Sequence, residues 1–378
     1  MLIAALLATG SGRAQMMMNP ARLSASLKSF DAIPGEPQLK CEVSPLRPTL
    51  NFSLRFQAGY LVRVPMSQYL GAGHSWAVFT RITPDPNGQP VYMRDRLGIP
   101  EVPKTKMEVE FGGIYLVGEG RYRVDWKLLD DSGRVCRKQW TFEARRNKNE
   151  RRLNAAMAPG TISEISLRQA RRTARNPDDA PPFRLTILLH AAPLSPRRSR
   201  LGGRDRVMLT GTLSALLERL PTRSVRMVAF SLDQQKELFR QDNFGLQGLD
   251  RVARAINETE MGTVDYTILQ NRRGHTELLA RLLNAELNDE NPSDVVLVVG
   301  PTSRFFDKLP EGTLEKPANP TPRFFFLRYG PAFRAEAALS DTISMAMSKL
   351  KGKTVLIRTP GDFVKAIELV ERRAVAGN

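Results

Sequence analysis

Two short apolar runs decide the fold of the second half of the chain: Arg184-Leu-Thr-Ile-Leu-Leu-His190 and Asp294-Val-Val-Leu-Val-Val-Gly300. Neither run shows the apolar–polar alternation of a half-exposed strand, so each is predicted to be a strand buried on both faces. Strands of this kind belong to parallel sheets that helices cover on both sides. The two runs therefore predict an α/β domain.

Helix-like and strand-like segments alternate around these two runs. Further strands are predicted at residues 224–231, 322–329 and 354–358, with an antiparallel edge strand at 236–240. Helices are predicted at residues 204–220, 246–257, 276–287, 340–351 and 360–373. This alternation predicts a three-layer, doubly wound α/β domain over residues 183–375.

Residues 35–145 have an all-β pattern. Leu50 to Val64 alternates in part, as a half-buried strand does, and Pro84-Asp-Pro-Asn-Gly88 carries the Asn-Gly signal of a hairpin. Residues 118–129 and 135–144 flank a second turn at Asp130-Asp-Ser-Gly133. Short strands with regular turns predict an Ig-like β-sandwich.

Cys41 and Cys136 are the only cysteines, and they fall in the predicted first and last strands of this sandwich. A disulfide between them would join the two ends of the domain and close a long loop. A structural zinc site is excluded by the number of available thiolates and imidazoles.

Two segments outside the domains have their own composition. Residues 1–15 are apolar and end in small residues, as a cleaved signal peptide does, so we expect a periplasmic or secreted protein. No later segment is apolar enough to predict a transmembrane helix. Residues 146–182 are basic and polar, and we expect a solvated linker there rather than a nucleic-acid arm, because stacking aromatics are missing.

The chain is strongly basic, with a formal net charge of +17. This balance suggests an anionic partner, either an envelope polymer or a lipid surface. A diffuse excess of arginine explains the same charge without any site. Binding to an anionic partner is therefore kept as an alternative to binding a protein.

The second domain resembles a von Willebrand factor type A domain. The resemblance rests on the order of the elements, on the loop Leu189-His-Ala-Ala-Pro-Leu-Ser195, on Gly274-His-Thr-Glu-Leu-Leu before a helix, and on Val295-Val-Leu-Val-Val-Gly300. Together with the sandwich, the chain resembles VWFA-related proteins of bacteria. The resemblance implies a metal-dependent adhesion site that grips a carboxylate of the partner.

The residues that form this metal site in the family are mostly replaced. Where the family has the motif Asp-x-Ser-x-Ser, this chain has His190, Ala192 and Leu194. Where the family has the later Asp, this chain has Gly300, and only the family's Thr is retained, as Thr276. Mg²⁺ needs several hard oxygen ligands. We therefore expect a degenerate site with neither metal nor cofactor. His190 and His275 are expected near each other, but two imidazoles are too few for an ordinary zinc site.

The sequence offers little support for an enzyme. It contains no G-x-S-x-G elbow and no phosphate-binding G-x-x-x-x-G-K-[ST] loop. A hydrolase built from serine and histidine at the strand ends is the remaining catalytic alternative. We expect a non-enzymatic protein.

Ligands of open α/β sheets bind at the carboxyl ends of the strands, here called the crest. We predict a protein-interaction module that presents its crest loops to a partner. Phe305-Phe306 follows one crest loop and either packs in the core or contacts the partner. The predicted partner-binding residues are His190, Ser195, Arg197, Arg198, Arg272, Arg273, His275, Thr276, Thr302 and Ser303.

Overall fold

The computed structural model describes residues 16–18, 38–164, 182–195, 198, 201–258, 270–315, 321–329 and 340–375. The chain divides into two compact units, Met1–Ser166 and Leu167–Asn378. The predicted signal peptide, residues 1–15, and Arg197 lie outside the described residues, as does much of the predicted linker.

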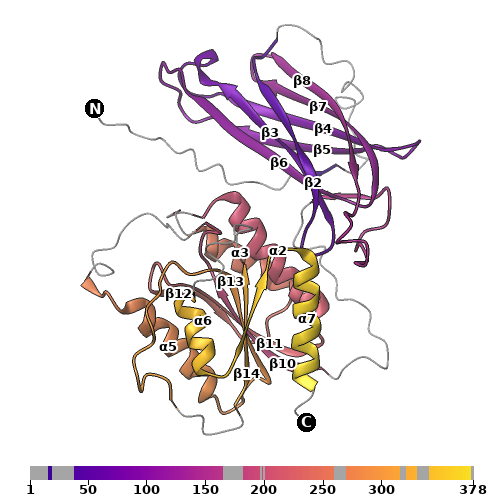
Figure 1. The fold of residues 1–378 in the computed structure, drawn as a ribbon. Coiled ribbons are helices and arrows are strands. Elements are labelled where there is room, and N and C mark those ends of the chain that lie inside the picture. The colour runs from indigo at the N-terminus through magenta and orange to yellow at the C-terminus, as the bar shows by residue number, and fades with distance from the viewer. Residues whose placement is uncertain are drawn as a thin grey trace. The chain divides into compact units, whose positions relative to one another are not determined.

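The first unit contains two antiparallel sheets (Figure 1). The five-stranded sheet has the order β1 (Met16–Met17), β5 (Val91–Gly98), β4 (Ser75–Asp85), β7 (Gly120–Asp130) and β8 (Val135–Ala144). The four-stranded sheet has the order β2 (Glu42–Leu50), β3 (Phe56–Pro65), β6 (Glu108–Val117) and β9 (Ile162–Glu164). A short 3-10 helix, η2 (Met66–Gln68), follows β3.

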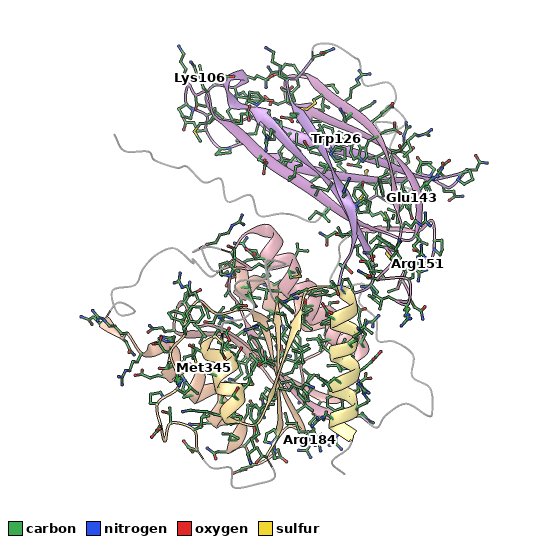
Figure 2. The ribbon with its side chains drawn as sticks, in the orientation of Figure 1. Lys106, Trp126, Glu143, Arg151, Arg184 and Met345 are labelled. Carbon is green, nitrogen blue, oxygen red and sulfur yellow. A yellow bond between two sulfur atoms is a disulfide. The ribbon has the colours of Figure 1, made fainter. Side chains whose placement is uncertain are left out.

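Aromatic side chains from both sheets form the core between them. Tyr60 on β3 meets Trp126 on β7 edge to face, with ring centroids 5.4 Å apart. Trp126 is fully buried in the interior of this unit (Figure 2). Cys41, directly before β2, forms a disulfide with Cys136 on β8, which confirms the predicted bond and links the two sheets covalently.

Three predictions for this unit are wrong in detail. Leu50 to Val64 is not one strand, because residues 51–55 form the turn between β2 and β3. Asn51 closes that turn by accepting a hydrogen bond from the Arg55 amide at 3.0 Å. The predicted linker is also shorter, because β9 pairs with β6 inside the first unit. Cys136 therefore lies in the last strand but one.

The second unit contains a mixed six-stranded sheet in the order β12 (Lys236–Gln241), β11 (Thr222–Ser231), β10 (Phe183–His190), β13 (Val295–Pro301), β14 (Arg323–Tyr329) and β15 (Lys353–Ile357). All neighbouring pairs are parallel except β11 and β12. The helices are α2 (Gly203–Arg219), α3 (Leu249–Asn257), α5 (Gly274–Leu287), α6 (Thr342–Lys349) and α7 (Pro360–Val375), with η4 (Leu246–Gly248) before α3.

Helices cover both faces of this sheet. Figure 1 shows α5 and α6 on one side, and α2 and α7 on the other. Leu188, Val296 and Phe326 of the sheet pack in one buried cluster with Leu279 of α5 and Met347 of α6. The predicted antiparallel edge strand is confirmed as β12. Among the described residues, no helix is long and apolar enough to cross a membrane.

Candidate functional site at the crest of the six-stranded sheet

The strand order of the six-stranded sheet reverses between β10 and β13. From β10 the chain moves outward to β11 and β12, and from β13 it moves outward in the other direction to β14 and β15. Loops on either side of such a point lead away from each other, which opens a crevice for ligands in many α/β proteins. His190 ends β10 at this point, and Gly300 and Pro301 end β13.

His190 fills this position with a side chain that is only 1% exposed. Its Nδ1 lies 3.4 Å from the carbonyl of Pro301, and its ring packs against Phe230 with centroids 5.4 Å apart. Nε2 is buried and has no hydrogen-bond partner among the described residues. Burial lowers the pKa of His190, and the negative charges of Asp233 and Asp341 offset only part of that effect. Burial therefore favours the neutral imidazole over the charged form.

Gly300 stands where the family resemblance would place a metal-binding aspartate. A Cβ at this position would lie 2.7 Å from the His190 carbonyl oxygen and 2.8 Å from the His190 Cβ. Non-bonded atoms do not approach each other this closely, so a Cβ at residue 300 would clash with His190. Residue 300 must be a glycine unless the backbone at the end of β10 moves. The position of His190 therefore leaves no room for a side chain at residue 300.

His275 belongs to a second, separate group at the start of α5. Its ring stacks on Phe305 with centroids 4.1 Å apart, and its Nε2 lies 2.9 Å from a carboxylate oxygen of Asp307. Thr276 beside it is also buried, and its hydroxyl donates to the Arg273 carbonyl at 2.8 Å. Among the described contacts, none joins His275 to His190.

Thr302 and Ser303 follow β13 and are held by their neighbours. Asp341 accepts hydrogen bonds from the amide of Ser303 at 2.6 Å and from the amide of Ser344 at 2.9 Å. The first bond fixes the loop after β13, and the second caps the N-terminus of α6. The Thr302 hydroxyl faces the Tyr329 carbonyl at 3.4 Å. These groups stabilise the loop and are not presented to solvent.

The predicted crest is therefore only partly a surface. Five of the predicted partner-binding residues are buried: His190, His275, Thr276, Thr302 and Ser303. His275, Thr276, Thr302 and Ser303 have polar contacts within the same unit, whereas Nε2 of His190 has none among the described residues. In the described part of the chain, the hydrogen bonds of the three histidines go to aspartates and backbone carbonyls and not to a serine.

Other predicted residues do reach the surface. Arg198, Arg272 and Arg273 are exposed, and Ser195 is half-buried. Arg272 and Arg273 directly precede α5, so they lie next to the His275 group. Arg198 follows β10 and its amide donates to the Ser195 carbonyl at 3.0 Å.

Sequence reasoning gave too little weight to Phe306, whose side chain is 51% exposed. The residues before it are anchored: Arg304 pairs with Asp233 at 2.5 Å, and the Phe305 carbonyl accepts a hydrogen bond from the Thr342 amide at 3.0 Å. Phe305 itself is half-buried against His275. Of the two phenylalanines, one packs inside and the other points outward. Nothing in the sequence distinguished them.

Among the described residues, no three His, Cys, Asp or Glu side chains are grouped closely enough to hold a metal ion. Asp233 and Asp341 were missed as crest residues. Ser340-Asp341-Thr342 at the start of a predicted helix is an N-cap pattern that points to Asp341.

No family profile matches the chain, and no curated protein matches it. Among solved structures, a Bordetella pertussis protein described as ApaA aligns at 15% identity and a TM-score of 0.21, over 30% of this chain and 100% of its own. OgpA from Akkermansia muciniphila aligns at 15% identity and a TM-score of 0.20, over 29% of this chain and 28% of its own. A family 2 glycosyl hydrolase from Bacteroides cellulosilyticus aligns at 11% identity and a TM-score of 0.21, over 84% of this chain and 44% of its own. Scores this low establish neither a shared fold nor a shared function, and none of the three is described as a von Willebrand factor type A domain.

Proposed function

We propose that the chain is an exported, non-enzymatic protein-interaction module. In this proposal the second unit is a von Willebrand factor type A-like domain with a degenerate metal site. It binds its partner through a crest surface, defined here as Arg272, Arg273, Arg304 and Phe306. The first unit, an Ig-like sandwich in this proposal, spaces or docks the second.

The observation that carries the proposal is the exposed Phe306 on an anchored segment. Aromatic and arginine side chains are enriched at the centres of protein interfaces. A backbone segment that is already ordered loses less conformational entropy when it binds. The contacts of Arg304 and Phe305 order the backbone directly before Phe306. The neighbouring Arg272 and Arg273 are both exposed and add positive charge beside it.

The geometry at the strand ends supports binding without a metal. Gly300 carries no carboxylate, and His190 occupies the space beside it. A partner would then be recognised by the apolar ring and the guanidinium groups. Arginine pairs with carboxylates in a bidentate geometry, so an acidic protein surface fits this chemistry.

The disulfide supports the exported location. Cys41 and Cys136 are bonded, and structural disulfides persist in the periplasm and outside the cell, whereas the cytosol keeps thiols reduced. Export through the segment 1–15 remains part of the proposal.

The test uses a photoreactive benzoylphenylalanine in place of Phe306 in the full-length protein, exposed to envelope and secreted fractions of the source cells. We expect a discrete crosslinked species that disappears when Arg272 and Arg273 are both changed to glutamate. The matched control changes Arg251 and Arg254, which are exposed on α3, to glutamate and should leave the species intact. The same probe at Met107 in the first unit, 56% exposed, should give no such species.

Two results would count against the crest surface. One is a crosslink at Met107 of equal strength. The other is a crosslink at Phe306 that survives the change of both arginines. Either would show that partner capture does not depend on this end of the sheet.

A further inference from the structure

The first unit leaves one long strand edge open to pairing. Its two sheets end in four edge strands, and three of these are blunted, either by their short length or by proline. β1 has two residues and β9 has three, while β2 carries Pro45 and Pro48. β8 has ten residues, Val135–Ala144, and none of them is proline. β8 is therefore the edge of this unit that can best accept a further strand.

The strand register shows which backbone groups of β8 face away from β7. The Asp130 amide donates to the Arg134 carbonyl at 3.1 Å, so the even-numbered residues that follow point their amides and carbonyls toward β7. The Leu39 amide donates to the Val135 carbonyl at 3.0 Å, so the odd-numbered residues point outward. Beyond Val135 the outward residues are Arg137, Gln139, Thr141 and Glu143. Within the described part of the chain, their amides and carbonyls have no hydrogen-bond partner.

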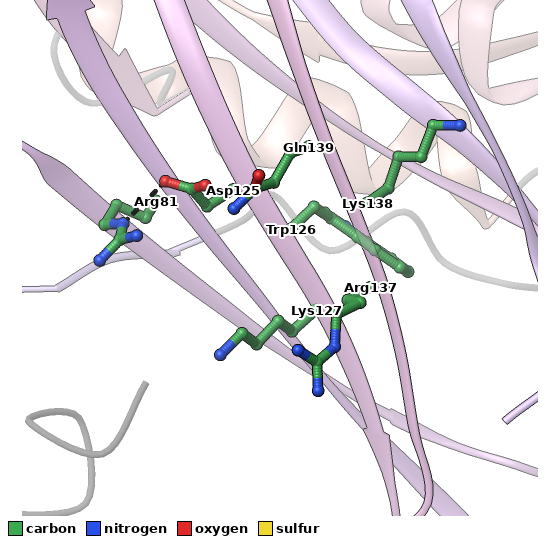
Figure 3. Close-up of a pocket in the computed structure, with 7 residues that line it drawn as sticks. All are labelled: Arg81, Asp125, Trp126, Lys127, Arg137, Lys138 and Gln139. Atoms are coloured by element: carbon green, nitrogen blue, oxygen red, sulfur yellow. Dashed lines mark hydrogen bonds and ion pairs between the residues drawn. The ribbon is translucent and has the colours of Figure 1, made fainter. Parts of the chain in front are cut away.

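The side chains of β8 alternate between the two faces of the sheet. Lys138 lies opposite the buried Trp126, so Lys138 and Trp140 belong to the inner face. Arg137 belongs to the outer face, and Figure 3 shows Arg137 and Lys138 pointing in different directions. The Trp140 ring lies 6.2 Å from that of Tyr60, yet Trp140 is only half-buried. An added strand would cover the part of this ring that the sandwich leaves exposed.

The sequence of β8 is complementary to itself when two copies lie antiparallel. The hydrogen-bonded pairs of such a ladder must join outward residues to outward residues. With Trp140 opposite Trp140 of the second copy, Arg137 lies opposite Glu143 at two symmetric positions. Gln139 then lies opposite Thr141, also twice. Opposite charges, hydrogen-bonding polar groups and paired aromatic rings all stabilise facing positions in a sheet.

The neighbouring alignments that keep outward residues paired match less well. Centring the ladder on Lys138 places two lysines opposite each other. Centring it on Thr141 places Arg137 opposite Arg145, the residue after β8. Like charges in these positions destabilise a sheet. Centring the ladder on Gln139 leaves Arg137 without an opposite charge, so the alignment on Trp140 is the favoured one.

We propose that two copies of this chain associate through β8, joining their five-stranded sheets into one continuous sheet. A two-fold axis brings the same surface of both copies together, which a self-complementary strand allows. Arg137 and Glu143 are exposed, and neither has an ion pair among the described residues, so both can pair across the axis. A second copy fits better than an unrelated peptide, because the charges and the aromatic ring of β8 match β8 itself. The interface lies in the first unit and is independent of the crest surface.

The test is the molar mass of the full-length protein, measured by light scattering after gel filtration over a range of concentrations. We expect a dimer. Arg137→Glu places like charges opposite each other at both symmetric positions, and so does Glu143→Arg. Each should raise the Kd of the dimer on the order of tenfold or more. Mixing the two variants should restore the dimer, because each supplies the charge that the other lacks. Recovery on mixing also shows that both variants are folded.

Two further variants separate strand pairing from general charge effects. Arg96→Glu is the matched control, because Arg96 is exposed on β5 of the same sheet and the change of charge is identical. Its Kd should stay within about twofold of that of the natural sequence. Thr141→Pro removes an outward amide, a position where an edge strand tolerates proline, and should give a monomer.

Four results would overturn the proposal. One is a natural sequence that stays monomeric at its highest soluble concentration, even if an unrelated extended peptide binds along β8. Another is a dimer that survives Thr141→Pro. The others are a failure of the two charge-reversed variants to associate on mixing, and a loss in Arg96→Glu equal to that in Arg137→Glu. Changing Arg272 and Arg273 of the crest surface should leave the dimer intact, so the two proposals can fail separately.

Discussion

The two units of this protein differ in how their buried polar residues relate to the predicted site, although both units bury some of them. The sandwich joins its two sheets with a disulfide and exposes Arg121 and Arg137 on its strands, whereas Asp125 and Lys127 are buried. The α/β unit takes polar groups inside: His190, Asp341 and Glu286 are all buried. The comparison teaches that five of the polar residues expected to meet a partner are buried in the second unit and serve its fold.

This difference can be followed in the intact chain, because each unit has its own spectroscopic signal. All three tryptophans, Trp76, Trp126 and Trp140, belong to the sandwich. The described α-helices all belong to the second unit. Tryptophan fluorescence therefore reports unfolding of the first unit, and circular dichroism at 222 nm mainly reports unfolding of the second.

The largest effect is expected from removing the disulfide. Changing Cys41 and Cys136 to alanine opens a loop with a sequence separation of 95 residues. On the chain-entropy model this costs the first unit about 4–5 kcal/mol. The fluorescence transition in urea should move to much lower concentration, while the dichroism transition stays in place. A parallel shift of both transitions would show that the units unfold together, which would break the comparison.

A smaller effect is expected from the charge network of the second unit. Arg226 on β11 pairs with Asp242 at 2.7 Å, with Glu286 at 3.4 Å and also with Asp289. Burial raises the pKa of Glu286, while the Thr186 hydroxyl and Arg226 act in the opposite direction. Arg226→Met would leave the Glu286 carboxylate buried without its cation. Such a loss costs about 3 kcal/mol.

Dichroism in urea measures this cost, and fluorescence should not register it. Arg240→Met is a suitable control, because Arg240 pairs with Glu237 on the same strand and is more exposed. Its effect should stay below about 1 kcal/mol. An unchanged dichroism transition in Arg226→Met would mean that the network does not stabilise the unit.

The smallest effect is a pH dependence of opposite sign in the two units. In the second unit, burial lowers the pKa of His190 below the ordinary value of about 6.5. The unfolded chain then binds a proton more readily than the folded one. Neutral His190 therefore contributes to the free energy of unfolding of the second unit above about pH 6.5, and this contribution is lost as the pH falls below that value. The dichroism transition should therefore weaken between pH 7.5 and 5.5.

In the first unit, the Leu70 carbonyl and Asp131 raise the pKa of His74 above its ordinary value. The folded first unit holds the proton of His74 more tightly than the unfolded chain does. Protonated His74 therefore contributes to the stability of the first unit below about pH 6.5, and this contribution is lost as the pH rises through the raised pKa. Melts of the natural sequence, His190→Gln and His74→Gln over this range test both signs. The prediction for His190 fails if the midpoint of the dichroism transition depends on pH as strongly in His190→Gln as in the natural sequence.

Local patterns in the sequence were sufficient for most of the secondary structure. The apolar runs before His190 and Gly300 became β10 and β13, and the edge strand at 236–240 became β12. The Asn-Gly pair was also informative, because few other structures than a tight turn accommodate it. The cysteines were informative because two cysteines allow only one pairing. Leu50 to Val64 was misread, since the buried Phe52 and Leu54 lie in a turn that has the same apolar spacing as a strand.

The sequence by itself thus determined most of the elements and the disulfide, because both depend on residue type and local spacing. Only the tertiary structure decided which polar side chains are accessible. It placed His190 against Phe230 and turned Phe306 outward, and it brought Lys127 beside Arg137. These outcomes depend on strand register and on the packing of segments distant in sequence, and no local pattern of residues specifies either.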